Sequence, residues 1–221
     1  MEVQIKTSTL LFLSELKDNN DREWFQENKK RYTDSVESFK HFINALIVGI
    51  QEIDNSLGSL TPEECIFRIY RDVRFSANKE PYKTNFGAYM APGGRKSQLA
   101  GYYFHVEPGS SFLSGGIYMA PPEIMRRVRE DIADYSEEFL KIVDANNFKK
   151  CFSFRDAEKL KKIPRGFEPG STVDEYLKMK YVAPAHPLAD DEITSPRMLE
   201  NSLNTFKELY PLIHFLNRAI R

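Results

Sequence analysis

The chain has 221 residues, enough for one large domain with a substantial hydrophobic core. Hydrophobic residues make up 41% and charged residues 29%, which is the balance of a globular protein. The net charge of −1 excludes a general electrostatic attraction to nucleic acid or to an anionic membrane, so any such partner would need a local basic patch.

Two further features point to the cell interior. Cys65 and Cys151 lie far apart and belong to no CxxC or Cys/His cluster, so we expect two free thiols in a reducing compartment. The apolar run TLLFL near the start is too short for a signal-peptide core, and no segment reaches the roughly 20 apolar residues of a membrane span. We therefore expect a cytoplasmic protein with no membrane contact.

The N-terminal segment predicts two helices. Leucines at spacings of three favour a short amphipathic helix over residues 7–18. Asn20, followed three residues later by Glu23, predicts a capping box that opens a second, long helix with one buried stripe. This helix is expected to end near Leu57 and Gly58.

The middle of the chain changes to a period of two. Alternation predicts four strands joined by short connections, which together form an antiparallel meander: 67–75, 82–90, 99–107 and 112–120. The pair Gly115 and Gly116 inside the last of these predicts a bulge or a close approach of another backbone.

The remainder is expected to be mostly helical. Pro122 suits the first position of a helix whose apolar stripe continues to Val143. Residues 148–192 predict turns, a helix at 173–180 and a short strand near 181–182, and residues 196–220 predict one or two helices around Pro211. The fold class is thus α+β: a single domain over residues 1–221, with an antiparallel four-stranded meander packed by several helices.

The alternation also assigns side chains to the two faces of the predicted sheet. One face is apolar, and the other carries arginine, tyrosine, asparagine and histidine, whose rigid polar groups suit recognition. We expect this polar face to bind a small anionic, possibly phosphorylated, ligand: arginines in bidentate contacts, lysines as diffuse charge, and a tyrosine and a histidine orienting it. The candidate ligand-binding residues are Arg68, Asp72, Arg74, Lys79, Lys83, Tyr103 and His105.

The charge pattern leaves an alternative open. Between residues 67 and 96 there are seven lysines and arginines but only two carboxylates. This excess favours an anionic ligand, but acidic residues of the helix at 129–138 could equally neutralise it. In that case the motif is a structural ion-pair lattice of a non-enzymatic module that binds a protein partner elsewhere.

Arg71 differs from the other basic residues, because the alternation places it among apolar side chains. An unpaired buried guanidinium is costly, so we expect a carboxylate from another element beside it. Glu23 and Glu27, early in the long helix, are the candidates.

Several segments resemble a widespread bacterial and fungal family of conserved hypothetical proteins, classed as a domain of unknown function. The resemblance runs through NNDREWFQENKKRY, FRIYRDVRFSANKEPYKTNFGA, GGIYMAPPE and LKKIPRGF, in this order over nearly the whole chain. The family's hallmark is an RDxRFSxDKxPYK motif, and Asn78 stands here where the family has Asp. The resemblance implies one architecture and marks the motif, but it implies no reaction.

Other chemistries have little support in the sequence. No cofactor motif is present, and the histidines are scattered without a second metal ligand at helical or hairpin spacing: His41, His105, His186 and His214. There is no nucleophile motif, and the basic strand lacks the glycines of an RNA-binding sheet, so we expect no nucleic-acid partner. If a reaction occurs, Asp72, His105 and Glu107 are the candidate proton-transfer groups.

Overall fold

The computed structural model describes residues 3–154 and 157–220. The N-terminal part is helical, and a long helix dominates it: α1 (Thr7–Asp18), α2 (Arg22–Glu27), α3 (Lys29–Ile53), the 3-10 turn η1 (Asn55–Leu57) and α4 (Pro62–Cys65). The rest of the chain forms one antiparallel sheet and a second helical group, so the α+β prediction is confirmed.

The sheet has four strands in the order in which they occur along the chain: β1 (Phe86–Met90), β2 (Gly101–Val106), β3 (Ser111–Gly116) and β4 (Ala185–Leu188). A 3-10 turn, η2 (Gly94–Lys96), lies between β1 and β2. The remaining helices occupy the stretch between β3 and β4 and the C-terminus: α5 (Pro122–Asp134), α6 (Ser136–Val143), α7 (Asn146–Cys151), α8 (Asp174–Leu177), α9 (Asp190–Ile193) and α10 (Met198–Ile220).

The predicted long helix is two helices, and its cap lies one residue later than expected. Asp21, not Asn20, is the N-cap, because its side chain accepts a hydrogen bond from the backbone of Trp24 at 2.9 Å. Asn28 separates α2 from α3, and α3 ends at Ile53. Asn20 instead bonds to the backbone of Tyr82, 62 residues away.

The C-terminal part differs from the expectation in several places. Helix α8 covers only Asp174–Leu177 of the helix predicted at 173–180, and α7 and α9 lie at the ends of a stretch where turns were predicted. The stripe predicted from Pro122 to Val143 forms α5 and α6, which meet at Tyr135. Helix α10 continues through Pro211.

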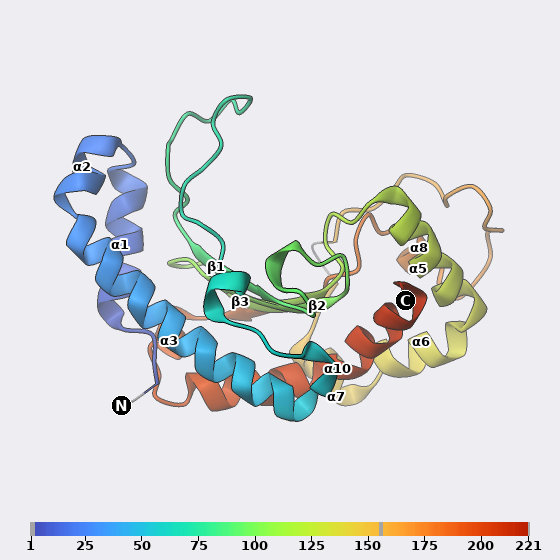
Figure 1. Ribbon diagram of the computed structural model, residues 1–221. Coiled ribbons are helices and arrows are strands. Elements are labelled where there is room, and N and C mark those ends of the chain that lie inside the picture. The colour runs from blue at the N-terminus through green and yellow to red at the C-terminus, as the bar shows by residue number, and fades with distance from the viewer. Residues whose placement is uncertain (1–2, 155–156, 221) are drawn as a thin grey trace.

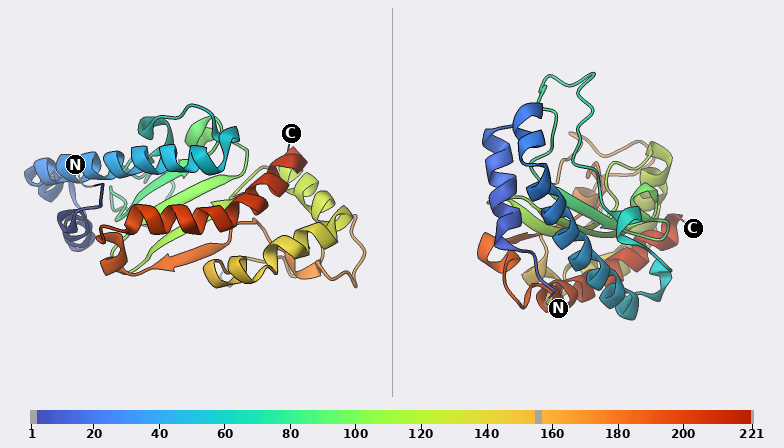
Figure 2. Two further views of the ribbon diagram at one scale, coloured as in Figure 1. Left: turned by 90° about the horizontal axis from the view of Figure 1, so that it is seen from below. Right: turned by 60° about the vertical axis from the view of Figure 1, so that its left-hand side comes forward.

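Helices α3 and α10 cover one face of the sheet. They run side by side across it in the left-hand view of Figure 2. Phe104 of β2 stacks on Phe39 and Phe42 of α3, with ring centroids 6.0 and 5.1 Å apart, and Tyr102 packs against Phe206 of α10 at 5.3 Å. This layer contains most of the hydrophobic core, and the opposite face of the sheet is left to the cavity described below.

One predicted strand is wrong, and another element supplies the fourth strand. Residues 67–75 form no strand; together with residues 76–83 they make a projecting loop, which we call the finger (residues 67–83; Figure 1). Among the described residues, backbone hydrogen bonds join its two arms only near the base, at the isolated pair Tyr70–Tyr82 and its neighbours. The fourth strand is β4, which pairs with β3.

No helix in the described ranges is long and apolar enough to cross a membrane. Both cysteines are free thiols, as predicted.

Candidate functional site

A cavity of about 800 Å³ lies over the face of the sheet opposite α3 and α10. Its floor consists of side chains that alternate with the core residues along three strands: Tyr89, Tyr103, His105, Phe112 and Ser114. The base of the finger, residues 117–121 and residues 181–185 supply the walls. In Figure 1 the finger stands at one side of this face, and α5 and α8 stand at the other.

Two side chains of the floor and one beside it form a hydrogen-bonded series. The Tyr103 hydroxyl oxygen lies 3.0 Å from His105 Nδ1, and His105 Nε2 lies 3.2 Å from Glu107 Oε2. The residues are two positions apart in an extended segment, so the pleat places them on one face. The second carboxylate oxygen of Glu107 accepts a hydrogen bond from Thr84 Oγ1 at 2.7 Å, which fixes this end of the series.

The chemistry of the partners determines where the protons lie. A carboxylate only accepts hydrogen bonds, so Nε2 of neutral His105 carries the proton and Nδ1 accepts from the Tyr103 hydroxyl. Burial, with smaller contributions from Tyr118 and Glu107, raises the pKa of Tyr103 to about 12, which keeps this hydroxyl protonated at neutral pH. The Tyr103 oxygen therefore keeps its lone pairs for a donor in the cavity.

His105 is held in its neutral form. Its side chain is buried, and this burial lowers its pKa; the hydrogen bond and charge of Glu107 act in the opposite direction and favour the imidazolium. The series from Tyr103 to Glu107 can thus accept a proton at the cavity and stabilise the resulting imidazolium, or return it.

The sequence makes room for this arrangement at Gly87. A Cβ atom at Gly87 would lie 2.5 Å from the Tyr103 hydroxyl oxygen. Because glycine has no side chain, the tyrosine ring can lie across β1 and reach His105.

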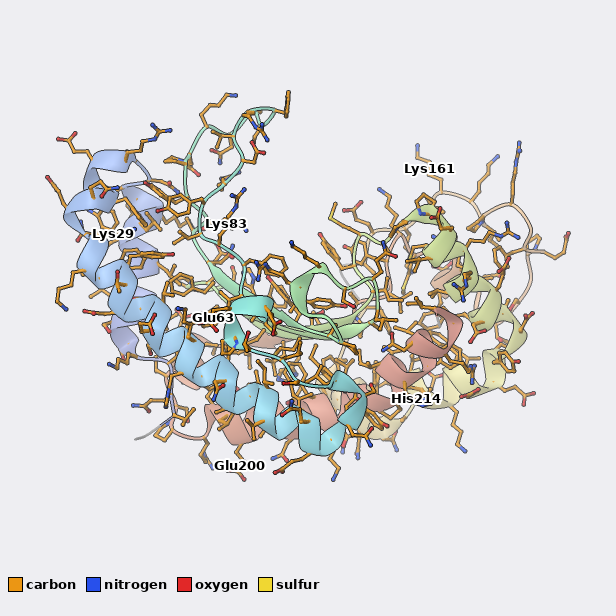
Figure 3. All side chains as sticks on the ribbon, in the orientation of Figure 1. Lys29, Glu63, Lys83, Lys161, Glu200 and His214 are labelled. Carbon is orange, nitrogen blue, oxygen red and sulfur yellow. The ribbon has the colours of Figure 1, made fainter. Side chains whose placement is uncertain are left out.

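Lys83 brings a positive charge to the cavity. Figure 3 shows it at the base of the finger, and its ammonium nitrogen lies 5.5 Å from the centroid of the Phe67 ring. Burial lowers the pKa of Lys83, and the nearby charges of Arg68 and Arg71 lower it further. Among the described residues no carboxylate pairs with Lys83, so the cation is not neutralised.

The outer part of the finger is a set of local contacts between its own residues. Arg74 forms a bidentate pair with Asp72, at 2.9 and 2.7 Å, and Lys79 donates to the carbonyl of Val73 at 3.1 Å. These three residues are exposed, and Arg68 is exposed nearer the base. In the described part of the chain, none of the four lines the cavity.

Arg71 does contact a carboxylate, but the partner differs from the two candidates. Its Nη1 atom lies 3.4 Å from Oε2 of Glu80, on the other arm of the finger. The expectation of Glu23 or Glu27 was wrong because it assumed a strand packed under the long helix, whereas the finger leaves the sheet.

The candidate residues thus fall into two groups. Lys83, Tyr103 and His105 line the same cavity, while Arg68, Asp72, Arg74 and Lys79 belong to the finger outside it. The alternation could have added Asn85, Tyr89, Phe112 and Ser114 to the first group, because they share the face of Tyr103. The wall segments at 117–121 and 181–185 fall partly within predicted strands, at 112–120 and 181–182, but apart from Ala185 they lie outside the sheet and are joined by the isolated pair Ile117–Val182, so alternation did not place them at the cavity.

Metal ligation has no geometric support in the described ranges, where no group of three or more His, Cys, Asp or Glu side chains could hold an ion. No carboxylate among the described residues accepts a hydrogen bond from His186. Its Nδ1 lies 2.6 Å from the carbonyl oxygen of Cys151 and therefore carries the proton.

A family model described as "Conserved hypothetical protein (DUF2461)" matches residues 8–215, a range that includes the finger, all four strands and the cavity. No curated protein and no solved structure matches the chain. Because the match covers nearly the whole sequence, the protein belongs to the DUF2461 family of conserved hypothetical proteins.

Proposed function

We propose that the protein binds a small anionic ligand in the cavity over the sheet, with Lys83 as the residue that attracts the anion. The observation that carries this proposal is a half-buried ammonium group that lines a cavity of about 800 Å³ without a carboxylate partner among the described residues. A cation held in partly desolvated surroundings gains more from an anion than an exposed one does.

The other candidate residues have different parts in this proposal. Tyr103 offers its oxygen as an acceptor to a hydroxyl or amino group of the ligand, and His105 fixes the direction of that oxygen. Arg68 lies close enough to Lys83 to lower its pKa and so strengthens the positive potential at the cavity. Asp72, Arg74 and Lys79 would reach the ligand only after a bend of the finger.

The hydrogen-bonded series of Tyr103, His105 and Glu107 supports acid–base chemistry on the bound ligand. We propose acid–base catalysis by these three residues as an enzymatic form of the anion-binding function. Lys83 would stabilise negative charge that develops on the ligand as a proton leaves it.

The second candidate function is an interaction module that uses the finger. It is favoured by the ion pairs Asp72–Arg74 and Arg71–Glu80, which satisfy four of the finger's charges locally. It is also favoured by Phe75, whose 95% exposed ring would be covered by a partner protein.

Thermal unfolding in the presence of inorganic phosphate, citrate and a panel of phosphorylated metabolites tests the ligand proposal. An anion at 100 times its Kd stabilises the folded state by ~2.7 kcal/mol, which raises the unfolding temperature measurably. We expect Lys83→Met to lose this stabilisation and the matched variant Lys79→Met to keep it. The proposal is wrong if no anion stabilises the protein, or if both variants respond as the unmodified chain does.

A further inference from the structure

The cavity is much larger than a small anion requires. Its volume of about 800 Å³ corresponds to the space of roughly 25 water molecules at ~30 Å³ each. It falls in the range of about 300–1,000 Å³ that is typical of sites for organic ligands of the size of a drug or cofactor. An inorganic phosphate or a two-carbon acid at Lys83 would leave most of it to water.

The cavity is also long. It extends from Phe112, near the start of β3, to Tyr118, beyond the end of that strand. The six residues of β3 span ~20 Å at 3.3–3.4 Å each. Lys83 lies toward the Phe112 end, because the adjacent residue Thr84 bonds to Glu107, two residues after the pairing partner of Phe112.

Away from Lys83 the walls are largely apolar and aromatic. The large apolar and aromatic residues of this part of the lining are Leu99, Ile117, Tyr118, Met119 and Tyr181. Tyr118 is 62% exposed and Met119 79% exposed, although both are large hydrophobic side chains. Their exposure at the rim is unfavourable in water and would be relieved by an apolar ligand group.

The backbone at this rim is strained. Met119 has a φ angle of 52°, a left-handed conformation that only glycine adopts easily. Such strain is concentrated where a fold holds residues for ligand contact. The Tyr118 ring is in turn supported by Tyr181, with ring centroids 4.7 Å apart.

We propose that the natural ligand is an amphipathic organic anion, with one anionic head at Lys83 and an aromatic or aliphatic body that extends over Phe112 toward Tyr118 and Met119. This inference rests on the proposed anion-binding function and names its ligand class. Arg95 also lines the cavity, and its guanidinium donates to the backbone carbonyl of Glu63, which positions the side chain but leaves its charge. We place the head at Lys83 because its ammonium group is half-buried beside the Phe67 ring, and the variant Arg95→Gln tests this choice.

Three probes separate the contributions of head and body. The fluorescent anion 8-anilinonaphthalene-1-sulfonate carries both, N-phenyl-1-naphthylamine has the same rings without the sulfonate, and methanesulfonate has the head alone. We expect the first probe to bind once per chain, at least tenfold more tightly than either of the others. Fluorescence titration measures the two aromatic probes, and displacement measures methanesulfonate.

Substitutions in the cavity test whether the probes bind at Lys83 and Phe112. Lys83→Met should weaken the anilinonaphthalene sulfonate at least tenfold and leave the neutral amine unchanged. Phe112→Ala should weaken both aromatic probes. Lys79→Met is the matched control in the finger and should change neither, while near-ultraviolet circular dichroism confirms that each variant is folded.

Each contrary result overturns a different statement. Equal affinity for methanesulfonate and the aromatic sulfonate would overturn the ligand class but leave the anion site. Equal affinity for the neutral amine and the sulfonate, with no effect of Lys83→Met, would overturn the anion site as well. A loss of affinity in Arg95→Gln but not in Lys83→Met would overturn the position of the head.

Discussion

His105 is the residue whose surroundings most constrain chemistry in the cavity. Its side chain is 8% exposed, its ring stacks on Phe112 with centroids 4.5 Å apart, and both ring nitrogens have hydrogen-bond partners. The ring therefore has one orientation and one neutral tautomer. Exchange of a proton with the cavity has to pass through Tyr103, which lies between His105 and a ligand.

We expect nuclear magnetic resonance to find the Nε2–H tautomer of His105 at neutral pH and a pKa below 6.5. Glu107→Gln should lower this pKa further, because it removes the negative charge that favours the imidazolium. The ring signals of exposed His41 provide an internal reference that the substitution should leave unchanged. A pKa above 6.5, or a proton on Nδ1, would contradict the arrangement.

The same shift has a consequence for stability. Since burial lowers the pKa of His105 in the folded state, the unfolded chain binds more protons as the pH falls below about 6.5. The free energy of unfolding should therefore decrease as the pH falls below about 6.5. The variant His105→Asn should show a smaller decrease. Urea unfolding at pH 7.5 and pH 5.5 measures this change in the free energy of unfolding. An equal change in the unmodified chain and in His105→Asn would contradict the prediction.

At this scale the alternation of residues was a good guide to the site only within regular strands. It assigned Tyr103 and His105 to one face, because β2 is a regular strand that pairs with β1 and β3. It could not find the carboxylate beside Arg71, because Glu80 comes from the opposite arm of an irregular loop. Side-chain partners across a loop depend on its path, which has no period in the sequence.

The finger is the element that the sequence predicted least well. Strand-like alternation at 67–75 is real, but the side chains of Asp72 and Asn78 bond to the nearby backbone nitrogens of Arg74 and Glu80. Such local bonds compete with pairing in a sheet, and a two-stranded ribbon alone is only marginally stable. The missed strand β4 contains Pro187, which argues against a central strand but is tolerated at an edge.

Asn20 holds the base of the finger. Its amide nitrogen donates to the Tyr82 carbonyl at 3.0 Å, and its amide oxygen accepts from the Tyr82 nitrogen at 3.1 Å. Loss of the side chain leaves two backbone groups of a buried residue without these partners, at a cost of ~1–3 kcal/mol. We expect Asn20→Ala to open the finger and to accelerate tryptic cleavage after its basic residues about tenfold.

Asn19→Ala is the matched control for this experiment. The Asn19 side chain is exposed and donates to the carbonyl of Glu15 within the same helical region, at 2.9 Å. Its removal should leave the cleavage of the finger unchanged. Equal cleavage rates in the two variants would show that Asn20 does not hold the finger.

The end of β3 depends on a close backbone contact that the glycine pair predicted correctly. Gly116 has a φ angle of 120°, and a Cβ atom there would lie 2.1 Å from the carbonyl oxygen of Val182. Both the conformation and the contact oppose any side chain, so Gly116→Ala should reduce the free energy of unfolding by at least ~3 kcal/mol.

A substitution at Gly109 distinguishes the effect of a positive φ angle from the effect of the contact with Val182. It also has a positive φ, of 72°, but a Cβ atom would meet nothing within 4 Å. Gly109→Ala should therefore cost only the conformational strain, ~1–2 kcal/mol. Urea unfolding measures both variants, and equal losses would mean that the contact with Val182 is unimportant.

On the scale of the whole molecule, the cavity follows from the uneven covering of the sheet. Helices α3 and α10 pack on one face and form the core with it, while the finger and helices α5 and α8 stand beside the other face (Figures 1 and 2). The sequence predicted the sheet, its apolar face and its helical cover, because these follow from hydrophobic periodicity. It did not predict the walls of the cavity, which are irregular segments brought together by the fold.

The DUF2461 family model covers the sheet, the finger and the cavity, and its description names no ligand, so experiment has to identify the ligand. We expect the anion to bind in the cavity at Lys83, at the base of the finger, and not at Arg74 or Lys79 on its exposed outer part. Long-range attraction to the finger and binding in the cavity are separate effects, because only the cavity is partly desolvated.

The most direct test is a crystal structure of the protein with 8-anilinonaphthalene-1-sulfonate. We expect the sulfonate within ion-pair distance, about 4 Å, of Lys83 Nζ, with the aromatic rings between Phe112 and Tyr118. A sulfonate bound at Arg74 or Lys79 on the finger, with the cavity filled by water alone, would contradict it.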